Sequence, residues 1–335
     1  MKPAVVIVTF MIKIYSMRAT FHEWEYSLEE MDVNPILAIK PSKEIIYPTT
    51  LYKYYALNKN NLHAFLNCQL YASQPEQFND MFDSNFLLTD FTKIPFDKIA
   101  NIFIPLEKVI KAREYKEDPI NFMYKFRNST YSDWQERCGL SCFTSNQLNE
   151  LMWAHYTSNS GFLVEYDFHQ FPVNIKGPYP INYIETLSTI DASMINPALA
   201  IIVSNLIKKN IWQYEQEYRF ILYPNDATFF TTTGRFPNVE DASKPKVQRL
   251  VKYPKTAIKK VLLGFNFFNH EKVSKEKPYT VQITSDYAIN KCFFLDHLIE
   301  NKFVIEIITW KNFKLVNRPM EIEKLDSTVY KIKIE

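Results

Sequence analysis

Residues 212–223 read W-Q-Y-E-Q-E-Y-R-F-I-L-Y. Taken as a β-strand from Tyr214 onward, the stretch alternates, because successive side chains of a strand point to opposite faces. One face holds Glu215, Glu217 and Arg219, and the other holds Tyr218, Phe220 and Leu222. Two carboxylates on one strand face lie about 7 Å apart, and the arginine beside them would keep them ionised.

A carboxylate placed in this way can stabilise an oxocarbenium-like centre, hold a sugar hydroxyl or act as a base. The alternative is a solvated strand edge with an ordinary glutamate–arginine ladder, which contributes little to stability. Periodicity alone favours the solvated edge.

Outward from this stretch, strands and helices intermix without regular alternation, which predicts an α+β fold. Strands are expected at 51–57, 70–72, 140–144, 161–168, 218–223, 260–263 and 303–309, and helices at 21–31, 58–67, 96–137, 147–157 and 197–212. The expected organisation is an N-terminal leader (1–45), a main domain (46–270) and a β-rich C-terminal extension (271–335) packed on the core.

Composition excludes several function classes. The 335 residues contain five glycines, too widely spaced for a Rossmann fingerprint or a P-loop. The four cysteines complete no zinc motif and indicate free thiols in a reducing cytoplasm.

The apolar run 4–12 is too short to span a bilayer. Aromatic residues make up 16% of the chain and can line a pocket for planar ligands, while the net charge of +2 leaves nucleic-acid binding to a local patch.

Residues 141–156 read S-C-F-T-S-N-Q-L-N-E-L-M-W-A-H-Y, a strand followed by an amphipathic helix. Ser145 or Asn146 is expected to be the N-cap of that helix. His155 and Tyr156 at the helix end are not explained by capping. A nucleophilic pair of Cys142 and His155 is disfavoured, because no third group orients it.

Residues 51–83 offer a cation and a group of oxygen ligands. Lys53 lies between tyrosines, where it can bind phosphate or carboxylate or contact a ring. Asn79, Asp80 and Asp83 could suggest a metal site, but such residues in a loop are more often turn formers. We therefore expect no metal.

Residues 244–260 carry seven basic residues and no acid. A solvated charged face is the usual explanation. Interleaved with Tyr253, the stretch also resembles a phosphate-contacting patch. Lys252, Lys255 and Lys259 are the nucleic-acid-binding candidates.

Six motifs occur in a fixed order: L-Y-K-Y, F-N-D-M-F-D, S-C-F-T, L-M-W-A-H-Y, G-F-L-V-E-Y-D and W-Q-Y-E-Q-E-Y-R. Together they resemble the bacterial domain-of-unknown-function family numbered 2971, over roughly residues 51–264. That family resembles, more remotely, the ADP-ribosyltransferase fold, which implies a split β-sheet and an NAD site without a glycine-rich loop.

The resemblance implies roles for individual residues. Glu217 in E-Q-E matches the catalytic glutamate, and Glu215 would position or deprotonate the acceptor. Tyr156 resembles the tyrosine that stacks on nicotinamide. The NAD-holding candidates are Lys53, Tyr54, Thr144, Ser145 and His155, with Lys53 or Tyr54 standing where relatives carry arginine or histidine.

The implied function is transfer of ADP-ribose from NAD to a macromolecule, with RNA or DNA favoured as acceptor. A cytoplasmic toxin or phage-defence effector, with an antitoxin or inhibitor protein as a further partner, is the implied setting. Two alternatives stay open: a non-enzymatic module that binds nucleic acid or nucleotides, and an NAD glycohydrolase with water as acceptor. No membrane partner is expected.

Overall fold

The computed structural model describes residues 18–21, 24–27, 39–41, 47–100, 103, 105–137, 139–193, 197–222, 249–285 and 288–335. The apolar run 4–12, Lys244 and Lys246 lie outside these residues. No described helix is long and apolar enough to cross a bilayer.

A large mixed β-sheet forms the centre of the molecule. Its strands, in spatial order, are β16 (Lys272–Val273), β17 (Tyr279–Gln282), β20 (Val329–Ile334), β19 (Lys314–Lys324), β18 (Val304–Lys311), β15 (Ile258–Leu263), β8 (Phe162–Tyr166), β4 (Leu51–Tyr55), β7 (Gly139–Thr144), β13 (Glu217–Leu222) and β9 (Ile175–Pro180). Within the described residues, neighbouring strands run antiparallel except for β15 and β18. With the helices described below, this sheet confirms the α+β class.

The sheet is weakest between β4 and β7. Their backbone pairing is confined to Tyr52 and Thr144, whereas β4 pairs with β8 along its whole length and β7 pairs with β13 along its whole length. The register therefore aligns Tyr52, Thr144 and Glu217 in one row across three strands.

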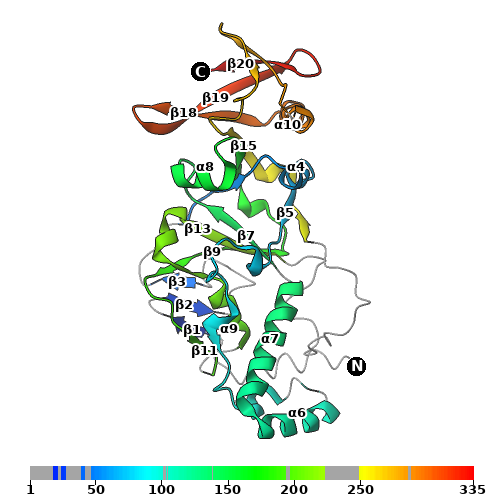
Figure 1. The fold of residues 1–335 in the computed structure, drawn as a ribbon, viewed down its shortest axis with the longest axis vertical. Coiled ribbons are helices and arrows are strands. Elements are labelled where there is room, and N and C mark those ends of the chain that lie inside the picture. The colour runs from blue at the N-terminus through cyan, green and yellow to red at the C-terminus, as the bar shows by residue number, and fades with distance from the viewer. Residues whose placement is uncertain are drawn as a thin grey trace.

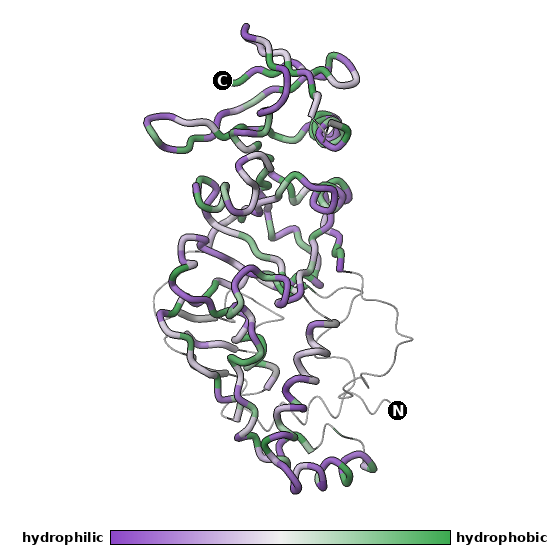
Figure 2. The backbone as a smooth tube through the Cα atoms, viewed as in Figure 1, coloured by the Kyte–Doolittle hydropathy of each residue, from purple (hydrophilic) through white to green (hydrophobic). Residues whose placement is uncertain are grey.

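Helices cover both faces of the sheet and one end of the molecule (Figure 1). They are α4 (Lys59–Leu66), α5 (Phe96–Ile99), α6 (Pro105–Glu117), α7 (Pro119–Arg137), α8 (Glu150–Thr157), α9 (Pro197–Ser204) and α10 (Ala288–Glu300). The largest apolar core packs α4 and α10 against one sheet face, where Phe65 and Phe294 both contact Phe162. Trp153 of α8 packs on the opposite face with Leu163 and Leu262. Figure 2 shows α6 as largely hydrophilic, and none of its side chains is buried.

Smaller strand groups lie beside the large sheet. They are β1 (Arg18–Phe21), β2 (Trp24–Ser27) and β3 (Ile39–Pro41) in one sheet, and three pairs: β5 (Gln69–Tyr71) with β14 (Leu250–Lys252), β6 (Thr89–Asp90) with β11 (Ile190–Asp191), and β10 (Asn182–Ile184) with β12 (Ile207–Lys209). Short 3-10 helices lie in the connections between elements: η1 (Pro75–Gln77), η2 (Phe86–Leu88), η4 (Phe168–Gln170), η5 (Asn210–Glu215) and η7 (Lys255–Ala257).

Two expected helices are wrong in whole or in part. Within the helix expected at 21–31, the described residues form strands instead: Phe21 ends β1, and Trp24–Ser27 is β2, which pairs with β1 and β3. The helix expected at 197–212 ends at Ser204, and Ile207–Lys209 pairs with β10 instead. The N-cap of α8 is also corrected: Asn149, and neither Ser145 nor Asn146, accepts the capping hydrogen bond, which the Met152 N–H donates.

The C-terminal strands continue the large sheet across residue 270, because β18 pairs with β15. Figure 1 shows β18, β19, β20 and α10 together at one end of the molecule. Lys260 of β15 forms ion pairs with Glu165 of β8 and Glu306 of β18. The proposed division into leader, main domain and extension stays a prediction.

Candidate functional site

A cavity of about 390 Å³ opens where β4, β7 and β13 meet. It is lined by Tyr52, Lys53, Tyr54, Gln77, Phe78, Asn79, Asp83, Cys142, Phe143, Thr144, Met152, His155, Tyr156, Lys208, Glu215 and Glu217. Segments far apart in the chain thus supply one surface. Tyrosine and phenylalanine rings supply part of the lining, and most of the remaining side chains are polar or charged. A concave surface that combines aromatic side chains with convergent polar groups is typical of a small-molecule site.

A sharp backbone turn brings the two glutamates into this cavity. Glu215 ends η5, Gln216 has φ +44° and ψ 50°, and Glu217 begins β13. The strand expected from Tyr214 onward is therefore wrong, since the left-handed Gln216 separates the carboxylates. Glu215 is 2% exposed and Glu217 4% exposed, so the solvated strand edge is wrong as well.

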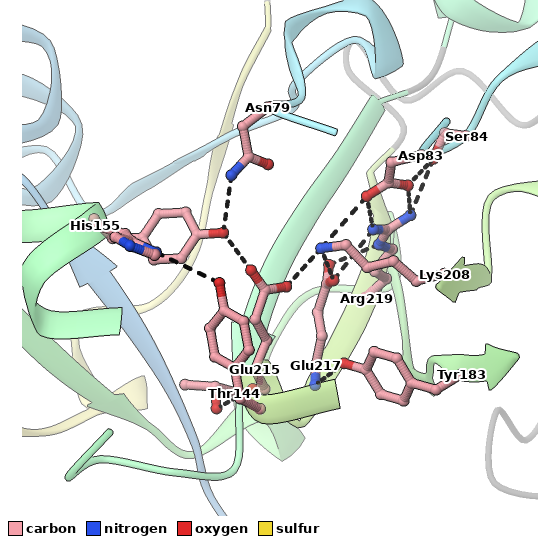
Figure 3. Close-up of polar contacts among 12 residues, drawn as sticks. Asn79, Asp83, Ser84, Thr144, His155, Tyr183, Lys208, Glu215, Glu217 and Arg219 are labelled. Carbon is pink, nitrogen blue, oxygen red and sulfur yellow. Dashed lines mark hydrogen bonds and ion pairs between the residues drawn. The ribbon is translucent and has the colours of Figure 1, made fainter. Parts of the chain in front are cut away.

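One lysine bridges the carboxylates. Lys208 of β12 donates to Glu215 Oε2 at 2.5 Å and to Glu217 Oε2 at 3.1 Å, and its Nζ lies 3.5 Å from Asp83 Oδ2 (Figure 3). The Nζ atom also lies 4.9 Å from the centre of the Trp212 ring. Burying an ammonium group is costly unless it is paired, and three carboxylates meet that requirement.

Arg219 holds the other side of the cluster. It is fully buried and donates from Nε to Glu217 Oε1 at 2.7 Å. Its Nη1 and Nη2 donate to the two oxygens of Asp83 at 2.7 and 2.5 Å, the paired geometry that suits a guanidinium and a carboxylate. Asp83, Glu215 and Glu217 set three negative charges against the two positive charges of Lys208 and Arg219. The fully ionised cluster is therefore net −1.

Asp83 differs from its expected role as a turn former. Its carboxylate is buried and serves Arg219, whereas Asp80 makes the turn by accepting from the Phe82 N–H at 3.0 Å. Within the described residues, no group of His, Cys, Asp and Glu side chains could hold a metal ion.

The surroundings of the two glutamates shift their pKa values in opposite directions. Burial alone would raise the pKa of Glu217, but the charges of Arg219 and Lys208 outweigh it and hold that pKa well below the ordinary range. Burial, with the nearby charge of Glu217, raises the pKa of Glu215. Carboxyl groups whose pKa values are pushed apart are typical of sites that need one fixed charge and one proton carrier.

Tyr156 of α8 links the cavity wall to Glu215. Its hydroxyl donates to Glu215 Oε1 at 2.5 Å and accepts from Asn79 at 3.5 Å. Burial, with the charge of Glu215, raises the tyrosine pKa, so this hydroxyl keeps its proton. Thr144 Oγ1 donates to the Glu215 carbonyl oxygen at 2.6 Å and so stabilises the backbone turn at Gln216.

Lys53 of β4 also lines the cavity, close enough to Glu217 for the two charges to interact. Its amino group donates to the Cys142 carbonyl oxygen at 2.9 Å and lies 5.2 Å from the centre of the Phe143 ring. Burial lowers the pKa of Lys53. Tyr54 donates its hydroxyl to the Asn146 carbonyl oxygen at 3.1 Å and packs edge-on against Trp153.

The structure brings most of the predicted site residues together. Lys53, Tyr156 and Glu217 line the same cavity, with Tyr54, Thr144, His155 and Glu215. Ser145 is not among the lining residues, and its hydroxyl donates to Gln216 Oε1 at 3.1 Å. Burial raises the pKa of Cys142, which disfavours a thiolate nucleophile there.

The basic candidates lie elsewhere. Lys252, Lys255 and Lys259 are exposed on β14, η7 and β15, and none of them lines the cavity. Lys259 is ion-paired with Asp167 at 3.1 Å, so acids distant in sequence partly neutralise the stretch. Tyr253 is buried, with its hydroxyl 3.2 Å from that of Tyr166, so its expected place in a phosphate-contacting surface is wrong.

Sequence reasoning missed two direct partners of the glutamates: Lys208, and Tyr183 of β10, whose hydroxyl accepts from the Glu217 N–H at 2.9 Å. It also did not predict the ion pair of Asp83 with Arg219. Lys208 was missed because residues 197–212 were predicted as one helix. The isolated pair of lysines after an apolar run was the available signal.

Comparison of the chain with protein-family models, with curated proteins and with solved structures found no match in any of the three.

Proposed function

We propose that the cavity is the active site of an enzyme that transfers ADP-ribose from NAD to a macromolecular acceptor. The observation that carries the proposal is the buried pair Glu215 and Glu217, bridged by Lys208 in a cavity that tyrosine and phenylalanine side chains also line. The resemblance of E-Q-E to the catalytic element of ADP-ribosyltransferases supports it. So does the weak pairing of β4 and β7, since that fold carries a split sheet.

The lining residues fit the parts of NAD. A volume of about 390 Å³ falls within the range of small-molecule sites. Tyr52, Tyr54 and Tyr156 offer rings to the nicotinamide, since planar aromatic groups favour offset or edge contacts with such rings. Lys53, which also lines the cavity, is the cation available to a phosphate.

The reaction breaks the bond between ribose C1′ and the nicotinamide nitrogen, and nicotinamide leaves with the electron pair. The positive charge that develops on the ribose is stabilised by ionised Glu217 and by the net negative charge of the cluster. An acceptor nucleophile then forms the new bond to C1′. Its proton passes to Glu215, whose raised pKa suits a proton carrier.

One observation favours the binding module as a second candidate. Both oxygens of Glu217 already accept hydrogen bonds from Arg219 and Lys208, which is also what a purely structural ion cluster requires. Arg219 Nη2 also donates to Glu217 Oε2 at 3.2 Å, and the Cys142 side chain hydrogen-bonds the same carboxylate. A carboxylate has about four lone-pair sites, so a ribose hydroxyl would have to take the place of one of these donors. Turnover, and not geometry, separates the two candidates.

The test is incubation of the full chain with NAD labelled in the adenylate part, with water alone and with separate pools of protein, RNA and DNA. The transferase predicts nicotinamide release together with labelling of one pool. Release without labelling of any pool would support the glycohydrolase. Intact NAD in every incubation would contradict both enzymes and leave the binding module.

A further inference from the structure

Four ring side chains either line the cavity or adjoin a residue that lines it, and we call them the aromatic strip: Phe82, His155, Trp212 and Tyr214. We propose that the aromatic strip and the adjacent Lys209 bind single-stranded nucleic acid and present it to the cavity as the acceptor. The role as acceptor rests on the proposed transferase, whereas the binding itself does not.

Each part of the strip is joined to a residue that lines the cavity. The Tyr214 hydroxyl lies 3.4 Å from His155 Nδ1, and His155 is itself a lining residue. Trp212 packs under Lys208, and the Trp212 and Tyr214 ring centres are 6.1 Å apart. Phe82 directly precedes Asp83 in the chain, and Asp83 lines the cavity.

The rings are accessible. Phe82 is 44% exposed and His155 is exposed, while Trp212 and Tyr214 are half-buried. A base stacked on an aromatic side chain contributes to binding whatever its identity, since every base has a π-face. In a duplex these faces are covered by neighbouring bases, so the strip suits single strands.

Lys209 supplies positive charge at the strip. Adjacent strand residues point to opposite sides, so Lys208 points into the cavity while the Lys209 amino group lies 4.4 Å from the centre of the Phe82 ring. In the part of the chain that the structure describes, no carboxylate is ion-paired with Lys209. A half-exposed cation among rings is the combination that contacts a phosphate between two stacked bases.

The strip is a different surface from the predicted basic patch. Lys259 is paired with Asp167, and Lys255 donates to Asn301 at 2.7 Å. Neither residue lines the cavity, so a strand bound there would not thereby reach Glu215. The aromatic strip instead lies beside Glu215, since Tyr214 directly precedes it in the chain, and Glu215 is the residue that accepts the proton in the proposed transfer.

The experiment measures fluorescence anisotropy of the full chain with a labelled 12-nucleotide RNA of mixed sequence, the matching DNA strand and the matching DNA duplex, all without NAD. Wild type should bind a single strand more tightly than the duplex. Phe82→Ala and Tyr214→Ala should each weaken binding by about 5- to 150-fold, the range typical of base-stacking rings. Lys209→Gln should reduce the slope of log affinity against log salt by about 0.7.

Matched controls are Phe313→Ala, a ring that is 97% exposed in the β18–β19 turn, and Lys255→Gln in the basic patch. Both should bind as wild type does. The proposal is overturned by unchanged affinity of Phe82→Ala and Tyr214→Ala, by equal binding of duplex, by loss confined to Lys255→Gln, or by no binding to either single strand. Comparison of the RNA and DNA arms identifies which single strand is preferred.

Nicotinamide release is measured separately, so the two proposals fail separately. A chain that binds single strands through the strip but never releases nicotinamide keeps the binding site and loses the transferase. A chain that releases nicotinamide but binds neither strand keeps an NAD-consuming site and loses the strip.

Discussion

At the residue scale, Lys208 and Arg219 determine what Glu217 can do. They surround its buried carboxylate with donors, so its charge is fixed before any ligand arrives. A preorganised charge of this kind stabilises a developing opposite charge without reorganisation. The same contacts make Glu217 a stabilising residue, which gives it two measurable roles.

The first role predicts a pH-dependent loss of stability. The pKa of Glu217 is depressed in the folded state, so its ionised form stabilises the fold above the unfolded pKa of about 4.3. That contribution is lost as the pH falls from there toward the depressed folded pKa. Glu217→Gln should cost about 3–5 kcal/mol at neutral pH, since it leaves buried cations underpaired.

Urea unfolding at a series of pH values measures this effect. The difference in the free energy of unfolding between wild type and Glu217→Gln should become smaller as the pH falls below about 4.3. Glu117→Gln, which alters an exposed ion pair with Arg113, is the matched control and should change stability by less than about 1 kcal/mol. A constant gap across the acid range would contradict the assigned ionisation.

Lys53 provides a prediction on substrate binding. Lys53→Met should raise the KM for NAD at least tenfold, since a hydrogen bond to a charged group contributes about 1.5–3 kcal/mol. Because burial lowers the pKa of Lys53, wild-type affinity should also fall as the pH rises toward that lowered value. Steady-state kinetics across alkaline pH measure both effects. An unchanged KM in Lys53→Met would remove this residue from the NAD site.

At the scale of elements, much of the secondary structure could be predicted. The strands β4, β7, β8 and β15 and the helix α4 fall where alternation and helical spacing indicated them. The sequence could not indicate the turn at Gln216, because left-handed backbone is expected of glycine and not of glutamine. Nor could it indicate β12, since Ile207–Lys209 is a strand only through its pairing with β10.

The turn at Gln216 predicts a selective response to substitution. Gln216→Gly should be tolerated, because glycine adopts φ +44° without strain. Gln216→Val should destabilise by about 1–3 kcal/mol and displace one glutamate from Lys208, because a β-branched residue resists this conformation. Thermal unfolding and nicotinamide release measure the two effects. Equal behaviour of the two variants would show that the turn is not needed to pair the glutamates.

At the scale of the whole molecule, the site exists only because distant segments meet. Asp83, Thr144, Tyr156 and Glu217 were each visible as polar residues in the sequence. Their convergence on one cavity depends on tertiary structure, including the register of β4, β7 and β13. The burial of Glu217 could not be predicted from the local sequence pattern either, because an edge strand and an interior strand can have the same alternation of side chains. The proposed transferase function of this cavity is tested by measuring turnover of NAD.

The most direct test measures nicotinamide release and NAD affinity in wild type and Glu217→Gln, at a temperature where thermal unfolding shows both to be folded. The charge acts mainly in the transition state, so turnover should fall about 10²–10³-fold while the Kd for NAD changes far less. Tyr156→Phe, which removes the hydroxyl bonded to Glu215, should also slow turnover, whereas Tyr124→Phe on α7 should not. Wild-type turnover in folded Glu217→Gln, or no nicotinamide release by wild type with any acceptor, would contradict the account.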